Sequence, residues 1–293
     1  MSDSLSTSRL SALVRLVRPL QWIKNFFVFA PLLFSGKFRF ESSIQNACIA
    51  FIAFCLVSSA VYVFNDLNDV ERDRRHPKKR FRPIASGQIP PFVAAVMIGM
   101  LLAACVSISL PTTWRLLLVL GAYLLLNIGY TLQLKHQPVI DIFCIAAGFV
   151  LRVVAGAVVL GVPLSSWMFV TTLCLALYLA SLKRRQELLA MKSDSETRAV
   201  LKHYSISLVD RYAEMSAVGA LLFYSLYVMN DGSRLVITIP IVLFGLFRYW
   251  FIVESKGEGE SPTDALVRDP LLISTIVAWT VVCISALSGW GIA

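Results

Sequence analysis

Four oxygen-bearing side chains follow one another at short spacing near the end of an apolar stretch. Asn65, Asp66, Asp69 and Asp73 stand in the segment FNDLNDVERD. If one helix continues through this segment, a rotation of roughly 100° per residue places the three aspartates within an arc of roughly 60° on one face. Carboxylates that share a face repel one another at neutral pH, and a divalent cation relieves that repulsion. Hard oxygen ligands of this kind suit Mg²⁺ that is bound together with substrate phosphates.

A cluster of basic residues follows the aspartates directly. Its members are Arg72, Arg74, Arg75, Lys78, Lys79, Arg80 and Arg82. A diphosphate needs a metal ion on some of its oxygens and Lys or Arg on others, so we expect Lys79 and Arg82 to bind substrate. The alternative is a helix at the membrane surface with solvated charges. Against that alternative, Asn65 and Asp66 adjoin the apolar run, where polar groups are costly and usually functional.

A second charged segment, SLKRRQEL, comes directly off a later apolar run and contains Lys183, Arg184 and Glu187. Lys183 and Glu187 are four residues apart and can pair on one helix. We expect the segment to bind anionic substrate across a cavity from the aspartates. The alternative is ordinary anchoring of a helix end by positive charge.

Three further groups of residues are candidates for the same site. Arg152 lies inside the apolar run AAGFVLRVVAGA. A buried arginine needs a partner, and the candidates are Asp141, an aspartate of the first motif or a substrate phosphate. Lys24 in RPLQWIKN, with Tyr130 and Lys135 in GYTLQLK, is expected at the same mouth. Each of these three taken alone is an ordinary interfacial side chain.

The composition is that of an all-α polytopic membrane protein. Hydrophobic residues make up 57% of the chain and charged residues only 15%. Apolar runs of about 18 to 22 residues recur along the chain, as crossing a hydrocarbon core requires. We expect nine transmembrane helices, near residues 20–36, 45–65, 91–110, 115–133, 139–160, 165–182, 212–230, 235–253 and 270–290.

The basic residues are distributed unevenly between the two sides of the expected spans. Most of the 27 lysines and arginines fall on the side of the N-terminus. This bias places the N-terminus and the long loops in the cytoplasm, at the inner (plasma) membrane, and an odd number of spans places the C-terminus outside. It also accounts for the net charge of +9 without nucleic-acid binding. We expect a single domain over 1–293, with loops 66–90 and 183–211 capping the active site.

The pattern Asn65-Asp66-x-x-Asp69-x-x-x-Asp73 resembles the first aspartate-rich motif of the UbiA superfamily of intramembrane prenyltransferases, and the resemblance covers nearly the whole chain. RPLQWIKN, KKRFRPIASGQI, YTLQLK, AAGFVLRVVAGA and SLKRRQEL resemble one branch, the decaprenyl-phosphate phosphoribosyltransferases. Other members carry a DxxxD motif in the second loop. Here Lys183, Arg184 and Glu187 stand in its place.

This resemblance implies a Mg²⁺-dependent enzyme whose metal ligands and catalytic residues are Asp66, Asp69 and Asp73. It implies transfer of a 5-phosphoribosyl group from phosphoribosyl diphosphate to a polyprenyl phosphate, with release of diphosphate. One alternative is transfer of a prenyl group from its diphosphate to an aromatic acceptor, which the missing acids of the second loop disfavour. A transporter is a more distant alternative. It is disfavoured because the charges gather on one side of the membrane, whereas transport sites usually lie near the bilayer midplane.

Overall fold

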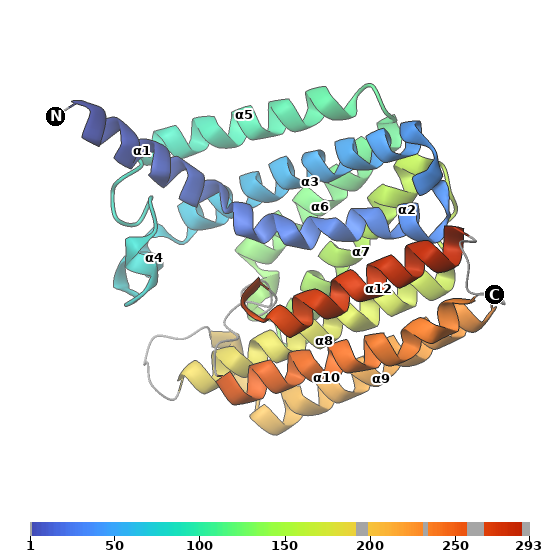
Figure 1. Cartoon of the computed structure of the whole chain (residues 1–293). Helices are drawn as coiled ribbons and strands as arrows, with labels where there is room; N and C mark the ends of the chain where they lie inside the picture. The colour runs from blue at the N-terminus through green and yellow to red at the C-terminus, as the bar shows by residue number, and fades with distance from the viewer. Residues whose placement is uncertain (1, 192–198, 231–233, 257–266, 289–293) are drawn as a thin grey trace.

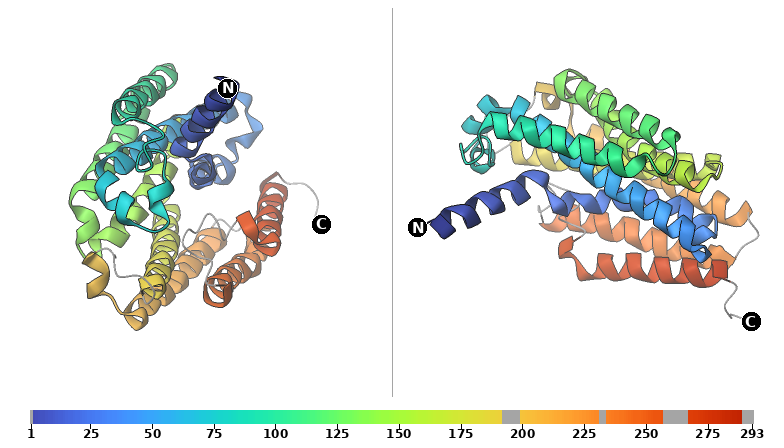
Figure 2. Two further views of the ribbon diagram at one scale, coloured as in Figure 1. Left: turned by 90° about the vertical axis from the view of Figure 1, so that its left-hand side faces the viewer. Right: turned by 90° about the horizontal axis from the view of Figure 1, so that it is seen from above.

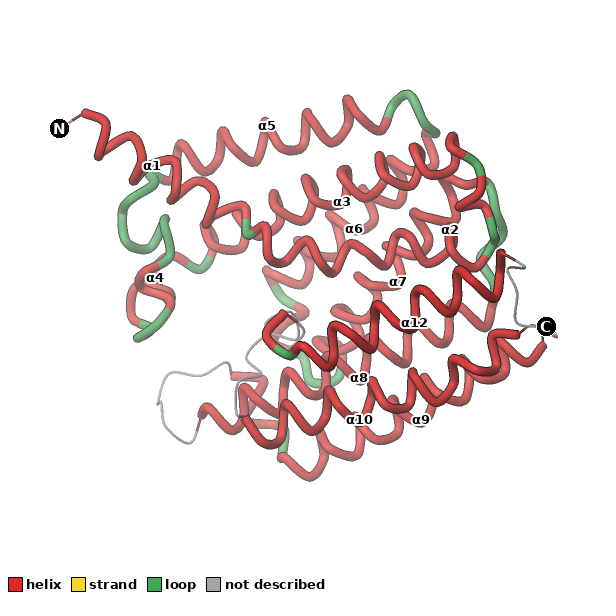
Figure 3. The backbone as a smooth tube through the Cα atoms, in the orientation of Figure 1, coloured by secondary structure: helices red, strands yellow, loops and turns green. Residues whose placement is uncertain are grey.

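The computed structural model describes residues 2–191, 199–230, 234–256 and 267–288, and every regular element in these ranges is a helix. Figure 1 shows the helices lying side by side along a common direction, and Figure 3 shows the short loops that join them at the two ends. The helices are α1 (Ser2–Val17), η1 (Pro19–Phe29), α2 (Ala30–Phe34), η2 (Lys37–Arg39), α3 (Glu41–Asn68), α4 (Val70–Arg75), η3 (Lys79–Phe81), α5 (Pro91–Ser109), α6 (Trp114–Leu132), η4 (Leu134–His136), α7 (Ile140–Leu160), α8 (Ser166–Met191), η5 (Ala199–His203), α9 (Ile206–Asn230), η6 (Arg234–Thr238), α10 (Ile239–Lys256) and α12 (Pro270–Ser288).

Within the described ranges, eight helices are long and apolar enough to cross a membrane. They are α3, α5, α6, α7, α8, α9, α10 together with η6, and α12, and each coincides with an expected span. Eight of the nine expected spans are thus single long helices. Residues 20–36, the ninth expected span, form the 3₁₀ helix η1 and the short α-helix α2.

The segment of η1 and α2 nevertheless runs along the bundle beside α3 and α7. A 3₁₀ helix rises about 2.0 Å per residue and an α-helix about 1.5 Å, so the eleven residues of η1 extend over about 22 Å. The segment packs closely against α7 at Gly156. A Cβ atom on Gly156 would lie 2.0 Å from the carbonyl oxygen of Val28, so only glycine permits this approach.

Helices α3 and α7 form the centre of the bundle, and α5 and α12 lie at its margins (Figure 2, left). The principal core cluster joins Phe54 and Val57 of α3 to Tyr123 of α6 and Ala155 of α7. Large apolar side chains on the outer helices are exposed, among them Phe92, Leu125, Met215 and Phe247. Exposed apolar surface of this extent suits a hydrocarbon environment.

The charged segments gather at one end of the bundle. The α3–α4 junction, the C-terminal end of α8 and η5 all lie there, at the left of Figure 1, and α12 ends at the opposite end. The helix α1 extends beyond its neighbours on the charged side (Figure 2, right). The described part of the chain therefore begins at one end of the bundle and finishes at the other. This is expected when the eight long helices and the η1–α2 segment each run along the bundle once. Residues 192–198 of the second expected loop lie outside the described ranges.

We expect Gly156→Ala to destabilise the protein by about 1–3 kcal/mol, because the added methyl group overlaps the backbone of η1. The matched control is Gly121→Ala in α6, where a Cβ atom meets nothing within 4 Å. Thermal unfolding of both purified variants in detergent measures the difference. Equal unfolding temperatures would show that η1 does not pack against α7 in this way.

Candidate active site

The aspartate motif lies where α3 bends into α4. The helix α3 ends at Asn68, and Asp69 adopts φ −99° and ψ 12° between the two helices, so the single continuous helix considered above does not form. The backbone N–H groups of Asp69 and Asp73 still donate to the carbonyl oxygens four residues earlier. The three carboxylates therefore stay within two turns of one another, but Asp69 has a different partner from Asp66 and Asp73.

Asp66 and Asp73 share one arginine. The Nη1 atom of Arg82 lies 2.9 Å from Oδ1 of Asp66 and 2.7 Å from Oδ2 of Asp73. Asp66 is only 2% exposed and Asp73 only 3%. Burial raises the pKa of Asp73, and the charge of Arg82 opposes that rise. Buried carboxylates require such compensation, because an unpaired buried charge costs several kcal/mol.

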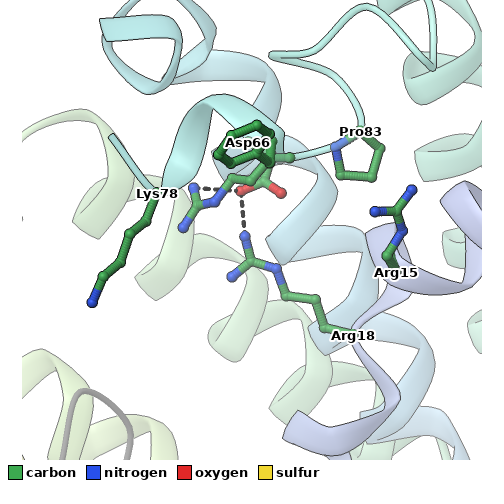
Figure 4. Close-up of a pocket in the computed structure, with 7 residues that line it drawn as sticks. Arg15, Arg18, Asp66, Lys78 and Pro83 are labelled. Atoms are coloured by element: carbon green, nitrogen blue, oxygen red, sulfur yellow. Dashed lines mark hydrogen bonds and ion pairs between the residues drawn. The ribbon is translucent and has the colours of Figure 1, made fainter. Parts of the chain in front are cut away.

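Two more cations reach the motif from distant parts of the chain. Arg18, at the junction of α1 and η1, donates from Nη2 to Oδ1 of Asp66 at 2.5 Å (Figure 4). Lys135 of η4 contacts both carboxylate oxygens of Asp69, at 2.9 and 3.2 Å. Lys135 was a predicted site residue, whereas Arg18 was not. The only sequence signal for Arg18 was its position at the start of RPLQWIKN.

The donor set at the motif consists of carboxylate oxygens, which Mg²⁺ prefers. Among the described residues, no three His, Cys, Asp or Glu side chains are close enough to form a metal site by themselves. Asp66 and Asp73 do converge, because both contact the same nitrogen of Arg82. A divalent cation between the two carboxylates would take the position of that guanidinium group. The residues present fit a metal whose remaining ligands come from substrate and water.

The second charged segment forms a buried cluster around Arg184, whose side chain is fully buried. Arg184 donates to Asp141 at 2.6 Å, to Glu187 and to the hydroxyl of Tyr130 at 3.0 Å. The hydroxyl of Tyr204 donates to Asp141 at 2.7 Å. Three of the predicted site residues thus meet here, but the guanidinium group is occupied by two carboxylates. Its role in the structure is to join α8 to α6 and α7.

A strained turn positions Asp141 at the start of α7. Val139 adopts φ 68° and ψ −48°, which is rare for a β-branched residue. The N–H of Ile140 donates to the carbonyl oxygen of Pro138, which closes a γ-turn around Val139. The N–H of Val139 donates to the hydroxyl of Tyr204, the same hydroxyl that donates to Asp141. Tyr204 therefore fixes both the turn and the carboxylate.

Arg152 does not have the acidic partner that the sequence suggested. Asp141 pairs with Arg184, and Arg152 donates instead to Oδ1 of Asn25, the carbonyl oxygen of Gly148 and the hydroxyl of Tyr123. Its guanidinium group also lies over three aromatic rings, with the closest centroid, that of Tyr123, at 4.9 Å. Neutral oxygens and π faces hold this charge, and they join η1 to α6 and α7.

The four remaining predicted site residues lie on different elements. Asn65 precedes the α3 bend, and Lys79 lies in η3, between the aspartates and Arg82. Lys24 is on η1, one residue before Asn25, and Lys183 is on α8 beside Arg184. All four side chains are half-buried. The structure thus brings together the aspartates with Arg82 and Lys135, and separately Tyr130, Arg184 and Glu187.

The comparison with known families decides what kind of protein this is. Residues 26–276 match the UbiA prenyltransferase family. The chain belongs to the UbiA prenyltransferase family. It is a multi-pass membrane transferase, and the predicted family and fold class are confirmed.

Relatives within the UbiA family extend over almost the full chain. The chain is 33% identical to a protein of Mycolicibacterium smegmatis named decaprenyl-phosphate phosphoribosyltransferase, over 92% of this chain and 90% of that protein. It is 34% identical to a protein of the same name from Corynebacterium glutamicum, over 93% of this chain and 85% of that protein. A UbiA homologue from Archaeoglobus fulgidus, solved bound to GPP and Mg²⁺, has the same fold, with a TM-score of 0.72 and 21% identity over 94% of this chain and 99% of that one.

We expect Arg184→Met to destabilise the protein by about 3–5 kcal/mol, because it leaves Asp141 buried without its cation. Lys183→Met, which removes a charge from the neighbouring position, is the matched control and should cost much less. Adding Asp141→Asn to Arg184→Met should restore part of the loss. Thermal unfolding measures all three variants, and additive losses in the double variant would contradict the pairing.

Proposed function

We propose that this UbiA-family protein transfers a 5-phosphoribosyl group from phosphoribosyl diphosphate to a polyprenyl phosphate of the decaprenyl type. The observation that carries the proposal is the similarity, over more than nine tenths of the chain, to two proteins that bear the corresponding name. The charges at the site support it. Carboxylates and cations alternate around the α3–α4 bend, as binding of a metal-bound diphosphate beside further phosphate requires.

We propose that Asp66, Asp69 and Asp73 hold Mg²⁺, in keeping with the Mg²⁺ bound to the similar structure from Archaeoglobus fulgidus. The metal supplies positive charge to the diphosphate as the C1–O bond of the ribose breaks. Arg82 and Lys135 now occupy the carboxylates, at distances of 2.7 to 3.2 Å. With the aspartates holding a cation, Arg82 and Lys135 would be available to bind the diphosphate oxygens, together with Lys79. Arg82 and Lys135 thus balance negative charge in both states of the site: that of the carboxylates without metal and donor, and that of the diphosphate with them.

The reaction proposed is displacement at C1 by an oxygen of the lipid phosphate, with inversion. A phosphate monoester has a second pKa of about 6, so it is already ionised near pH 7 and needs no strong general base. Among the described residues, the side-chain ion pairs of the three aspartates are made with Arg18, Arg82 and Lys135, and none is made with a histidine. Catalysis would rest on positioning and on charge stabilisation.

The remaining predicted residues are assigned to the outer parts of the site. We assign Asn65, Lys24, Tyr130 and Lys183 to contacts with substrate phosphates, and Glu187 to orienting the cations beside them. Arg184 and Arg152 act as positioning residues, because each has its donors engaged within the protein. The charged end faces the cytoplasm under this proposal, since positive residues collect there. The lipid tail would lie among helices exposed to the bilayer.

A direct assay tests the proposal. Purified protein, labelled phosphoribosyl diphosphate, decaprenyl phosphate and Mg²⁺ should give a labelled product that partitions into organic solvent, and chelation of Mg²⁺ should prevent its formation. The family and the GPP-bound similar structure also justify a second arm with a prenyl diphosphate and an aromatic acceptor. Product in that arm alone would replace the phosphoribosyl assignment by ordinary prenyl transfer.

We expect Asp66→Asn or Asp69→Asn to reduce turnover by at least about 100-fold, because each loses a charged metal ligand. Glu71→Gln is the matched control, since Glu71 is exposed and forms its ion pair with Arg74 on the surface of α4. Turnover at saturating Mg²⁺ measures the effect, and unfolding temperature shows that the variants remain folded. Full activity of a folded Asp66→Asn variant would remove the metal role.

A further inference from the structure

A basic pocket opens beside the aspartate motif on the side of α1 (Figure 4). Its lining residues are Arg15, Arg18, Asp66, Lys78, Phe81, Arg82 and Pro83, and its volume is about 280 Å³. Drug-sized ligands occupy roughly 300–1,000 Å³, so this pocket suits one small group of a larger molecule. In Figure 4, Arg15 and Lys78 lie on opposite sides of Asp66, and Arg18 approaches its carboxylate.

The charge of this basic pocket is strongly unbalanced. Four of its lining residues are cationic and a single one, Asp66, is acidic. Asp66 is already contacted by Arg18 and Arg82, and Arg82 also pairs with Asp73. The excess positive charge therefore lies with Arg15, Arg18 and Lys78. A guanidinium group has five N–H donors, and one carboxylate oxygen engages few of them. The pocket therefore presents an excess of positive charge and of donors to whatever enters it.

The backbone at Arg18 is strained in a way that aims its side chain into the pocket. Arg18 adopts the left-handed conformation, with φ 55° and ψ 61°, directly before Pro19. This conformation is costly for a residue with a side chain, and doubly so before proline. The hydroxyl of Ser59 donates to the carbonyl oxygen of Val17, and the ring of Tyr62 lies 5.1 Å from the Arg18 guanidinium carbon. Strain of this kind persists where neighbouring structure fixes it, often at functional sites.

The two walls of the pocket are joined to each other. Arg15 donates to the side-chain oxygen of Gln88 at 2.7 Å. On the same helix, Ala12 and Leu16 are buried against Ile84 and Ile89 of the segment that also carries Arg82. The pocket is therefore formed between α1 and the segment 78–89. Buried apolar contacts, and not only the exposed Arg15–Gln88 hydrogen bond, hold these two walls together.

We propose that this pocket binds the 5-phosphate of the ribosyl donor, an inference that rests on the function proposed above. Asp66 belongs both to the pocket and to the carboxylates assigned to the metal, so a group in the pocket lies beside the diphosphate. Phosphoribosyl diphosphate carries its two phosphate groups on one small sugar. The lipid phosphate is the other monoester available, but its chain needs an apolar path, and only Phe81 and Pro83 of the lining are apolar.

The pocket accounts for donor selection. A prenyl diphosphate has no second phosphate, so it would leave the excess positive charge of the pocket without a partner. Arg15, Arg18 and Lys78, which the sequence did not single out as site residues, then become specificity determinants. Arg15 makes the sharpest test, because it lies on α1 and the three aspartates form their ion pairs with Arg18, Arg82 and Lys135 instead.

The first test is a direct binding measurement with ribose 5-phosphate on the full-length protein in detergent, by calorimetry. We expect Arg15→Gln to weaken binding roughly 10-fold, through loss of a charge-assisted contact, and Arg15→Lys to weaken it less. Arg211→Gln is the matched control, because Arg211 is an exposed arginine near the start of α9, at the same end of the bundle. Equal affinity of wild type and Arg15→Gln, or an equal loss in Arg211→Gln, would overturn the proposal.

The second test separates the donor from the lipid acceptor. In the transfer assay, we expect Arg15→Gln to raise KM for phosphoribosyl diphosphate roughly 10-fold and to leave KM for decaprenyl phosphate unchanged. A rise in the acceptor KM alone would overturn the donor assignment. Product formation with an unchanged donor KM would overturn the pocket proposal while the function stands. Binding of ribose 5-phosphate that depends on Arg15, without any product, would sustain the phosphate site and refute the function.

Discussion

Two carboxylates buried at one end of a membrane bundle are the constraint on which the rest of this structure depends. Asp66 and Asp73 are almost fully enclosed, and a single guanidinium nitrogen of Arg82 contacts both. Unpaired charges in such a position would cost several kcal/mol each. Their compensation holds the segment after α4 against α3, brings the start of η1 in through Arg18 and brings η4 in through Lys135. The same charges that make the site therefore fix the positions of α4, η3 and η4 relative to α3.

The bundle holds its other buried arginines in two different ways. Arg184 is matched by Asp141 and Glu187, so its charge is cancelled locally. Arg152 is surrounded by neutral oxygens and aromatic rings, so its positive charge remains in the centre of the bundle. Both tie α7 to its neighbours, and the tight contact at Gly156 adds a third connection. The site is thus supported on helices that cannot move independently.

Membership of the UbiA family determines the fold but does not identify the substrate. The similar structure from Archaeoglobus fulgidus superposes at a TM-score of 0.72 with only 21% identity, so the fold tolerates wide change in side chains. This chain gathers charge at one end of the bundle, with cations on α1, in the segment 78–82 and on η4 around a few carboxylates. Function resides in such sites and not in the fold that carries them.

The sequence by itself determined the eight long helices, the end of the bundle that carries the charges and the aspartate motif, because hydrophobic length and local spacing are local properties. It did not determine the 3₁₀ form of η1 or the close packing of η1 against Gly156. The sequence also did not predict the ion pair of Arg184 with Asp141 or that of Arg18 with Asp66. It did not predict the hydrogen bonds of Arg152 to Asn25 and Tyr123. These contacts join residues 29 to 127 positions apart. Only the tertiary structure decided them, because a buried charge takes whichever partner the packed helices place beside it.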